Sequence, residues 1–141
     1  MINPIDIRQL IPQRQPIMMV DQLVDADEQS AVCQLTVRPD NFFLQSDGTL
    51  AETGIIEHMA QTASAHCGFL ALQRGSSDEA PIGYIAEVKG FSLLSQPKLG
   101  DTLTTTVRTL LSAGNVTVVS AETNAQDRPV ATTQLKISLK E

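Results

Sequence analysis

The sequence contains no tryptophan, and aromatic residues make up only 4% of its 141 residues. A core of normal size must therefore be filled by Leu, Ile, Val, Met and Ala. Charged residues are also scarce, at 18%, while 42% of the residues are hydrophobic, which excludes a disordered chain. The length suits one domain, and we predict a single domain over residues 1–141.

The sequence contains few positively charged residues. Ten Lys and Arg residues stand against 16 Asp and Glu residues, which gives a net charge of −6. This sign disfavours nucleic acid and anionic membrane surfaces as partners. No apolar run approaches the roughly 20 residues of a membrane-spanning helix, and residues 1–20 lack the charged-then-apolar order of a signal peptide. We therefore expect a cytoplasmic protein that does not enter a membrane.

Cysteine is rare as well. Cys33 and Cys67 are the two cysteines, and neither lies in a CxxC or His-flanked pattern, so we predict no metal site and no cofactor. The expected state is two reduced thiols. A disulfide between them, or a nucleophilic Cys67 assisted by His66, is a less favoured alternative because adjacent helical residues point about 100° apart.

The first third of the chain predicts a short helical turn, a hairpin and a loop. Asn3 precedes Pro4 in the pattern of a helix start, which predicts a helical turn over 5–10. Residues 18–26 and 32–38 predict two strands of a hairpin. Residues 42–50 show neither helical nor strand periodicity, so we interpret them as a loop.

One long helix is predicted over residues 52–73, ended by Gly75. Its apolar stripe consists of Ile56, Met59, Ala60, Ala63, Cys67, Leu70 and Ala71. The other faces carry small side chains, so the helix should be buried around much of its circumference, with a sheet wrapped around it.

The remaining segments predict strands. They cover residues 82–88, 91–95, 103–111, 116–123 and 130–139, separated by turn signals. We interpret them as an antiparallel meander. The predicted fold class is α+β, a curved antiparallel sheet around one central helix.

Four motifs resemble those of the 3-hydroxyacyl-acyl-carrier-protein dehydratases of type II fatty acid synthesis, which have the hot-dog fold. IPQRQPIMMVD at 11–21 resembles LPHRxPxLLVD, and IEHMAQ at 56–61 resembles IEAMAQ. PIGY at 81–84 and PKLGD at 97–101 resemble the later IGY and PxxxGD motifs. The likeness covers nearly the whole chain, and it implies the hot-dog fold.

The chain departs from that family at its catalytic motif, HFPGxPxMPG. Counting back from Glu57 puts Glu52 at the last Gly and Phe43 at the His, and residues 42–50 contain no histidine. The chain is therefore more similar to the His-lacking dehydratase-like proteins of aryl polyene pigment clusters, which pair with a separate His-bearing dehydratase.

The resemblance implies a role for each of five residues. Glu57 would act on the departing hydroxyl, the backbone amide of Glu52 would polarise the thioester carbonyl, and the general base is missing. Gln61, Phe43 and Phe42 would contact the substrate. Met18, Met19 and Phe91 are weaker candidates for lining an acyl tunnel, because apolar residues beside strands are more often core.

Neither histidine is predicted to replace the base. His58 lies about 100° around the helix from Glu57, and His66 lies about 180° away. The pattern alone favours Glu57 as a solvated residue four positions from Gln61, whereas the family resemblance favours a catalytic role.

The predicted function is that of a 3-hydroxyacyl-acyl-carrier-protein dehydratase subunit whose Glu57 completes a composite site with a His-bearing partner. We expect a heterodimer or a dimer of dimers, and otherwise a homodimer, with an acyl carrier protein delivering the substrate. Arg14, Lys89, Lys98 and Arg108 could meet an acidic carrier or be ordinary surface charge. The alternatives are a hot-dog acyl thioesterase and a catalytically silent scaffold that binds acyl carrier protein.

Overall fold

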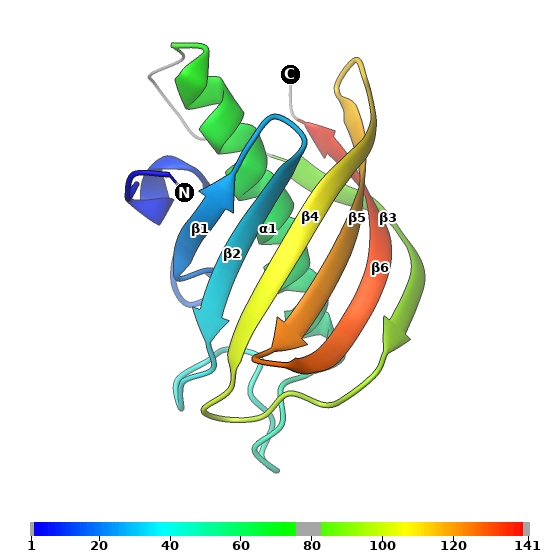
Figure 1. Ribbon diagram of the computed structural model, residues 1–141. Helices are drawn as coiled ribbons and strands as arrows, with labels where there is room; N and C mark the ends of the chain where they lie inside the picture. Colours follow the sequence, from blue (N-terminus) through cyan, green and yellow to red (C-terminus); the bar gives the residue numbers. More distant parts are fainter. Residues whose placement is uncertain (1, 76–82, 140–141) are drawn as a thin grey trace.

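The computed structural model describes residues 2–75 and 83–139, and in it one long helix packs against a six-stranded antiparallel sheet (Figure 1). The elements are the 3-10 helix η1 (Ile7–Gln9), β1 (Gln22–Ala26), β2 (Ser30–Thr36), α1 (Glu52–Gln73), β3 (Gly83–Leu93), β4 (Thr102–Ala113), β5 (Val116–Ala125) and β6 (Arg128–Leu139). The predicted α+β class and the bounds of the long helix are confirmed. The predicted link at 76–80 and the strand residue Ile82 lie outside the described residues.

The strand order in the sheet is β1-β2-β4-β5-β6-β3. β1 and β2 form the predicted hairpin, and β4, β5 and β6 form a meander. The prediction that all strands after the helix form one meander is wrong for β3, which pairs with β6 at the far edge. The sequence pattern identifies a strand, but it does not identify the strand's partner.

The segment between β3 and β4 returns the chain from that edge to the middle of the sheet. It is fixed by backbone hydrogen bonds from Leu50 to Pro97 (2.9 Å) and from Gly100 to Val37 (2.9 Å). These contacts place the loop over 42–50 beside the end of β2. The loop prediction is confirmed, since 42–50 contains only isolated bridges and turns.

The ends of β2, β4, β5 and β6 differ from the predicted strands by one or two residues, and three further differences are larger or change an element. The predicted strands 82–88 and 91–95 form one strand, β3, with an irregularity between Lys89 and Ser92 where Gly90 has φ +67°. The strand predicted over 18–26 begins only at Gln22, because the residues before it bind a helix side chain. The N-terminal turn is shorter than predicted and is capped by Asp6, not Asn3.

α1 is enclosed along its middle, as predicted. Every residue from Gln61 to His66 is buried, and Gly75, at φ +84°, follows the helix end. Gly68 allows the N-terminal segment to cross α1 closely, since a Cβ at this position would lie 2.2 Å from the Leu10 carbonyl oxygen. A larger side chain there would force two backbones apart.

The cysteine prediction is confirmed, since Cys33 and Cys67 are both free. Burial raises the pKa of the Cys33 thiol to about 12 and also raises the pKa of Cys67. Thiols in such surroundings remain protonated and are poor nucleophiles.

Two negative observations concern the described residues. Within 2–75 and 83–139, no helix has the length and apolar character that crossing a bilayer requires. The same ranges contain no group of three or more His, Cys, Asp or Glu side chains placed to hold a metal ion.

Candidate active site

Glu57 lies in a cavity of about 310 Å³ between the first half of α1 and the beginning of β3. The N-terminal segment closes a third side. The lining residues are Gln13, Glu57, Ala60, Ser64, Gly83, Tyr84, Ile85 and Ile137. The cavity combines small and apolar walls with four polar side chains, a composition typical of a small-molecule site.

Gln61 holds the Glu57 carboxylate in place. Its Nε2 donates hydrogen bonds to Glu57 Oε2 (2.7 Å) and to the Ile17 carbonyl (2.9 Å), and its Oε1 accepts one from the Met19 N–H (2.6 Å). These backbone partners fix which end of the amide faces Glu57. Gln61 donates to Oε2, which leaves Oε1 as the Glu57 oxygen without a hydrogen-bond partner among the described residues.

Replacing Gln61 with Leu is expected to lower the free energy of unfolding by about 2–5 kcal/mol, because it leaves the Met19 N–H and the Ile17 carbonyl unpaired in the interior. Urea denaturation measures the change. Thr62→Val is the control, since it removes the buried hydrogen bond to the His58 carbonyl on the same helix and a contact with the Cys33 thiol, but no bond to the N-terminal segment. Equal losses in the two variants would contradict the bridging role of Gln61.

His58 is fully buried and binds the same N-terminal segment as Gln61 does. Its Nδ1 donates to the Met19 carbonyl (2.6 Å), while its Nε2 is buried without a hydrogen-bond partner in the described structure. Burial lowers the pKa of His58 to about 4, against smaller opposing effects of the Met19 hydrogen bond and Asp21. The ring is therefore neutral near pH 7, and its one bound proton is engaged.

His58 is expected to make folding sensitive to acid. Its pKa of about 4 in the folded state lies below the ordinary value of 6.5, so its contribution is complete above pH 6.5 and is lost as the pH falls towards 4. The loss corresponds to about 3 kcal/mol. His58→Asn keeps a donor for Met19 but does not titrate, so its stability should fall less between pH 7 and pH 4.5 in urea denaturation. Parallel curves for both proteins would contradict this assignment.

His66 faces a different part of the fold. Its ring is buried, and its Nε2 lies 2.8 Å from the Asp27 carbonyl oxygen in the turn between β1 and β2. Both histidines therefore bind backbone carbonyls, and neither lines the Glu57 cavity. That neither histidine replaces the missing base stays a prediction.

Phe43 occupies the loop beside the start of α1. Its carbonyl accepts from the Ala51 N–H (3.0 Å), and a Cβ on Gly54 would lie 2.6 Å from the Phe43 Cβ. Phe43 and Phe42 meet edge to face with ring centroids 5.1 Å apart, and Phe42 is 60% exposed. The loop thus presents hydrocarbon at the position that the motif count from Glu57 assigns to the histidine of the resembled dehydratases.

No side chain caps the N-terminus of α1. Ala51 is the N-cap residue and makes no side-chain hydrogen bond to the helix, while the Glu52 side chain is exposed. The first backbone N–H groups of a helix have no partner within the helix, and they favour negative charge. This leaves the predicted donor role of the Glu52 amide available.

The structure brings some of the predicted site residues together. Glu57 and Gln61 are hydrogen-bonded, whereas Phe42, Phe43 and Glu52 lie near the helix start and do not line the cavity. Sequence reasoning did not single out the other polar lining residues, Gln13, Ser64 and Tyr84. Gln13 and Tyr84 both lie within motifs that carry the family resemblance. Their place in these motifs is the signal by which the sequence could have identified them.

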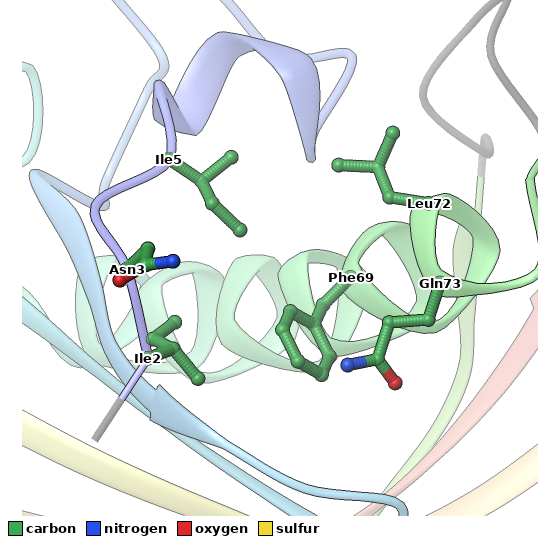
Figure 2. A pocket seen from close by; sticks show the side chains of 6 residues that line it. All are labelled: Ile2, Asn3, Ile5, Phe69, Leu72 and Gln73. Atoms are coloured by element: carbon green, nitrogen blue, oxygen red, sulfur yellow. The ribbon is translucent and has the colours of Figure 1, made fainter.

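A second hollow lies away from Glu57, between the N-terminal segment and the last turns of α1 (Figure 2). Its volume is about 410 Å³, and its lining is Ile2, Asn3, Ile5, Phe69, Leu72 and Gln73. Figure 2 shows these side chains converging from the two elements. The hollow holds no ionisable side chain and shares no residue with the Glu57 cavity, so it has no part in the chemistry of Glu57.

The model of a protein family, ApeP-like, described as ApeP dehydratase, matches residues 5–140. The chain belongs to the ApeP-like dehydratase family. The sequence-based assignment to a dehydratase family is confirmed by this match. A comparison with curated proteins gives no match.

Solved structures support the same fold. The dehydratase heterocomplex ApeI:P from Xenorhabdus doucetiae superimposes with a TM-score of 0.90 at 21% identity, covering 97% of this chain and 92% of that one. A hypothetical thioesterase with coenzyme A from Streptococcus pneumoniae TIGR4 gives a TM-score of 0.67 at 14% identity, covering 84% of each chain. The E. coli PaaI protein from the phenylacetic acid degradation operon gives 0.61 at 18% identity, covering 82% and 80%. These likenesses show the hot-dog fold.

Proposed function

We propose that this member of the ApeP-like dehydratase family is a subunit of a 3-hydroxyacyl-acyl-carrier-protein dehydratase and completes a composite site with a His-bearing hot-dog partner. One observation carries the proposal: Gln61 holds Glu57 at a cavity that no histidine of the described residues lines. The chain supplies a carboxyl group that can act as the general acid, and among the described residues it lacks a side chain at this cavity that can act as the general base.

The edge strand β3 supports a partner at this place. β3 pairs only with β6 among the described strands, and it exposes Tyr84 (58%), Ile85 (38%) and Val88 (38%). Long edge strands with apolar side chains are templates for pairing with another chain. Since Gly83, Tyr84 and Ile85 also line the Glu57 cavity, a chain that covers β3 would close the site. The related ApeI:P structure is a heterocomplex, which favours a different chain as this partner.

The proposed reaction removes water from a 3-hydroxyacyl thioester. A base on the partner takes the proton from the carbon next to the carbonyl, and the electron pair forms the new double bond as the C3–O bond breaks. The Glu57 Oε1 proton passes to the departing hydroxyl, which leaves as water. The Glu52 N–H at the start of α1 stabilises the charge that develops on the thioester oxygen.

A further cavity offers room for an acyl chain. It has a volume of about 470 Å³, lies towards the C-terminal half of α1, and shares Ile137 with the Glu57 cavity. Its lining combines apolar residues, among them Ala63, Leu70, Val119, Ile137 and Leu139, with polar side chains that include Glu28, His66 and Arg74. An acyl chain whose C3 atom lies at Glu57 can extend along α1 into this space.

Delivery by an acyl carrier protein is part of the proposal. Carrier proteins are acidic, so exposed basic side chains are the expected contacts. Arg14 is a weak candidate, because its guanidinium donates to the backbone carbonyls of Arg8, Ile11 and Gln13. Lys98 and Arg108 are exposed.

The test is to purify this chain from its native host, determine by intact mass what it assembles with, and assay the complex on 3-hydroxyacyl carrier protein. A His-bearing hot-dog chain in the complex, with loss of water from the substrate, is the expected result. Thioester hydrolysis by the purified chain would favour the thioesterase. Tight acyl binding without turnover, even with a His-bearing partner, would favour the scaffold.

A further inference from the structure

The backbone of Met19 is bound on both sides by side chains of α1. His58 Nδ1 donates to the Met19 carbonyl (2.6 Å), and Gln61 Oε1 accepts from the Met19 N–H (2.6 Å). A carbonyl only accepts and an N–H only donates, so these two bonds fix which nitrogen of His58 carries the proton and which end of the Gln61 amide faces Met19. All three residues are completely buried, so water does not compete for these bonds.

The same amide connects Met19 to Glu57. Gln61 Nε2 donates to Glu57 Oε2 at 2.7 Å, and a continuous path of hydrogen bonds therefore leads from His58 through Met19 and Gln61 to Glu57. His58 and Glu57 are neighbours in the sequence, but their side chains point about 100° apart on the helix. Their connection therefore runs through the N-terminal segment and not along the surface of α1.

The orientation of the Gln61 amide matters for the proton on Glu57. As observed, Gln61 presents an N–H to the carboxyl group and no acceptor. If the amide turned by about 180°, its oxygen would face Glu57 Oε2 and accept the carboxyl proton, so Gln61 would compete with the substrate hydroxyl for that proton. The Met19 N–H disfavours the turned amide, because it would then face the NH₂ group and lose its acceptor.

Met19 is not held by a strand. β1 begins at Gln22, and residues 18–20 belong to no regular element. The position of the Met19 N–H therefore depends on what binds Met19 itself, and His58 supplies the bond on the carbonyl side. His58 is also costly, since its Nε2 is buried without a hydrogen-bond partner in the described structure. An apolar side chain would fill this space without that cost, so the bond to Met19 is what the histidine contributes.

We propose that His58 is a positioning residue for the dehydration: its bond to the Met19 carbonyl fixes the orientation of the Gln61 amide, which leaves the Glu57 proton for the substrate. The inference rests on the proposed function, since Glu57 is the acid of that reaction. His58 does not line the Glu57 cavity, and it neither touches the substrate nor transfers a proton. It acts on the reaction through Met19 and Gln61.

The test measures single-turnover dehydration of 3-hydroxyacyl carrier protein by the mixed complex, together with the affinity for this substrate. His58→Leu has similar volume and no donor. It should slow dehydration by about tenfold, the effect of one misplaced hydrogen bond, while the affinity changes less than about twofold. His58→Asn offers an amide N–H at the place of Nδ1 and should restore the rate to within about threefold of the original.

Two controls separate this role from a general loss of structure. Thr62→Val keeps every bond between α1 and Met19, and its rate should stay within about twofold of the original. In Gln61→Met the amide is already absent, so adding His58→Leu should slow dehydration by less than about twofold further. Circular dichroism verifies the fold of each variant. Where His58→Leu or the double variant does not assemble, the comparison of His58→Ala with His58→Asn in the otherwise unchanged chain decides.

Three results would overturn the inference: an unchanged rate in His58→Leu, a His58→Asn variant as slow as His58→Leu, or the same loss from His58→Leu with and without the Gln61 amide. The proposed function is tested separately by Glu57→Gln. Loss of turnover in Glu57→Gln together with any of the three results would retain the proposed function and reject the role of His58. Full turnover in Glu57→Gln would reject both.

Discussion

Glu57→Gln is expected to slow dehydration by the mixed complex by about 10²–10⁴-fold without preventing assembly. The substitution keeps the size of the side chain and can still meet Gln61, but it removes the proton that Oε1 would transfer. Glu57 is partly exposed at the cavity, so the fold does not depend on its charge. A single-turnover measurement with 3-hydroxyacyl carrier protein reports the chemical step.

The design must exclude activity from partner homodimers. In the heterodimer proposed above, the partner's histidine would face Glu57, whereas the partner's own carboxyl would face Phe43 and have no base. Replacing the partner's carboxyl should therefore silence contaminating homodimers and leave the mixed site active. Glu52→Gln is the control on this chain, since its side chain is exposed and only its backbone amide is used. An unchanged rate in Glu57→Gln would remove Glu57 from the mechanism and favour the scaffold.

The long helix could be predicted from the sequence because all of its signals are local. The helical periodicity begins at Glu52, Gly75 follows the helix end with a positive φ, and both bounds agree with the structure. The position of β3 could not be predicted in this way. Its pairing with β6 instead of β4 depends on backbone contacts, such as that between Leu50 and Pro97, that join residues far apart in the chain.

The same difference between local and long-range signals applies to the candidate site. Glu57 and Gln61 are four residues apart on one helix, a spacing that brings side chains together, and they are hydrogen-bonded. Gln13 reaches the cavity from the N-terminal segment and Tyr84 from the edge strand, so their position beside Glu57 is a property of the tertiary fold. The short sequence motifs include Gln13 and Tyr84, but they do not predict that these residues lie beside Glu57.

The chain without a partner is expected to dehydrate 3-hydroxyacyl carrier protein about 10²–10⁴-fold more slowly than the mixed complex. The reason is the absence of a base. Phe43 packs beside the helix start, His58 is enclosed with its Nδ1 proton bound to Met19, and His66 contacts the Asp27 carbonyl. None of these groups lines the cavity that contains Glu57.

The measurement compares the purified chain with the mixed complex at equal concentrations of Glu57 sites, by following the appearance of the enoyl product. Adding the His-bearing partner should restore the rate, and adding a partner whose histidine is replaced should not. Strong activity of the isolated chain that disappears in His66→Ala, with the fold intact by circular dichroism, would show that the histidine reaches the substrate after all. That result would place the base on this chain and make the partner unnecessary for the chemistry, because Glu57 and the base would then both come from copies of the same subunit.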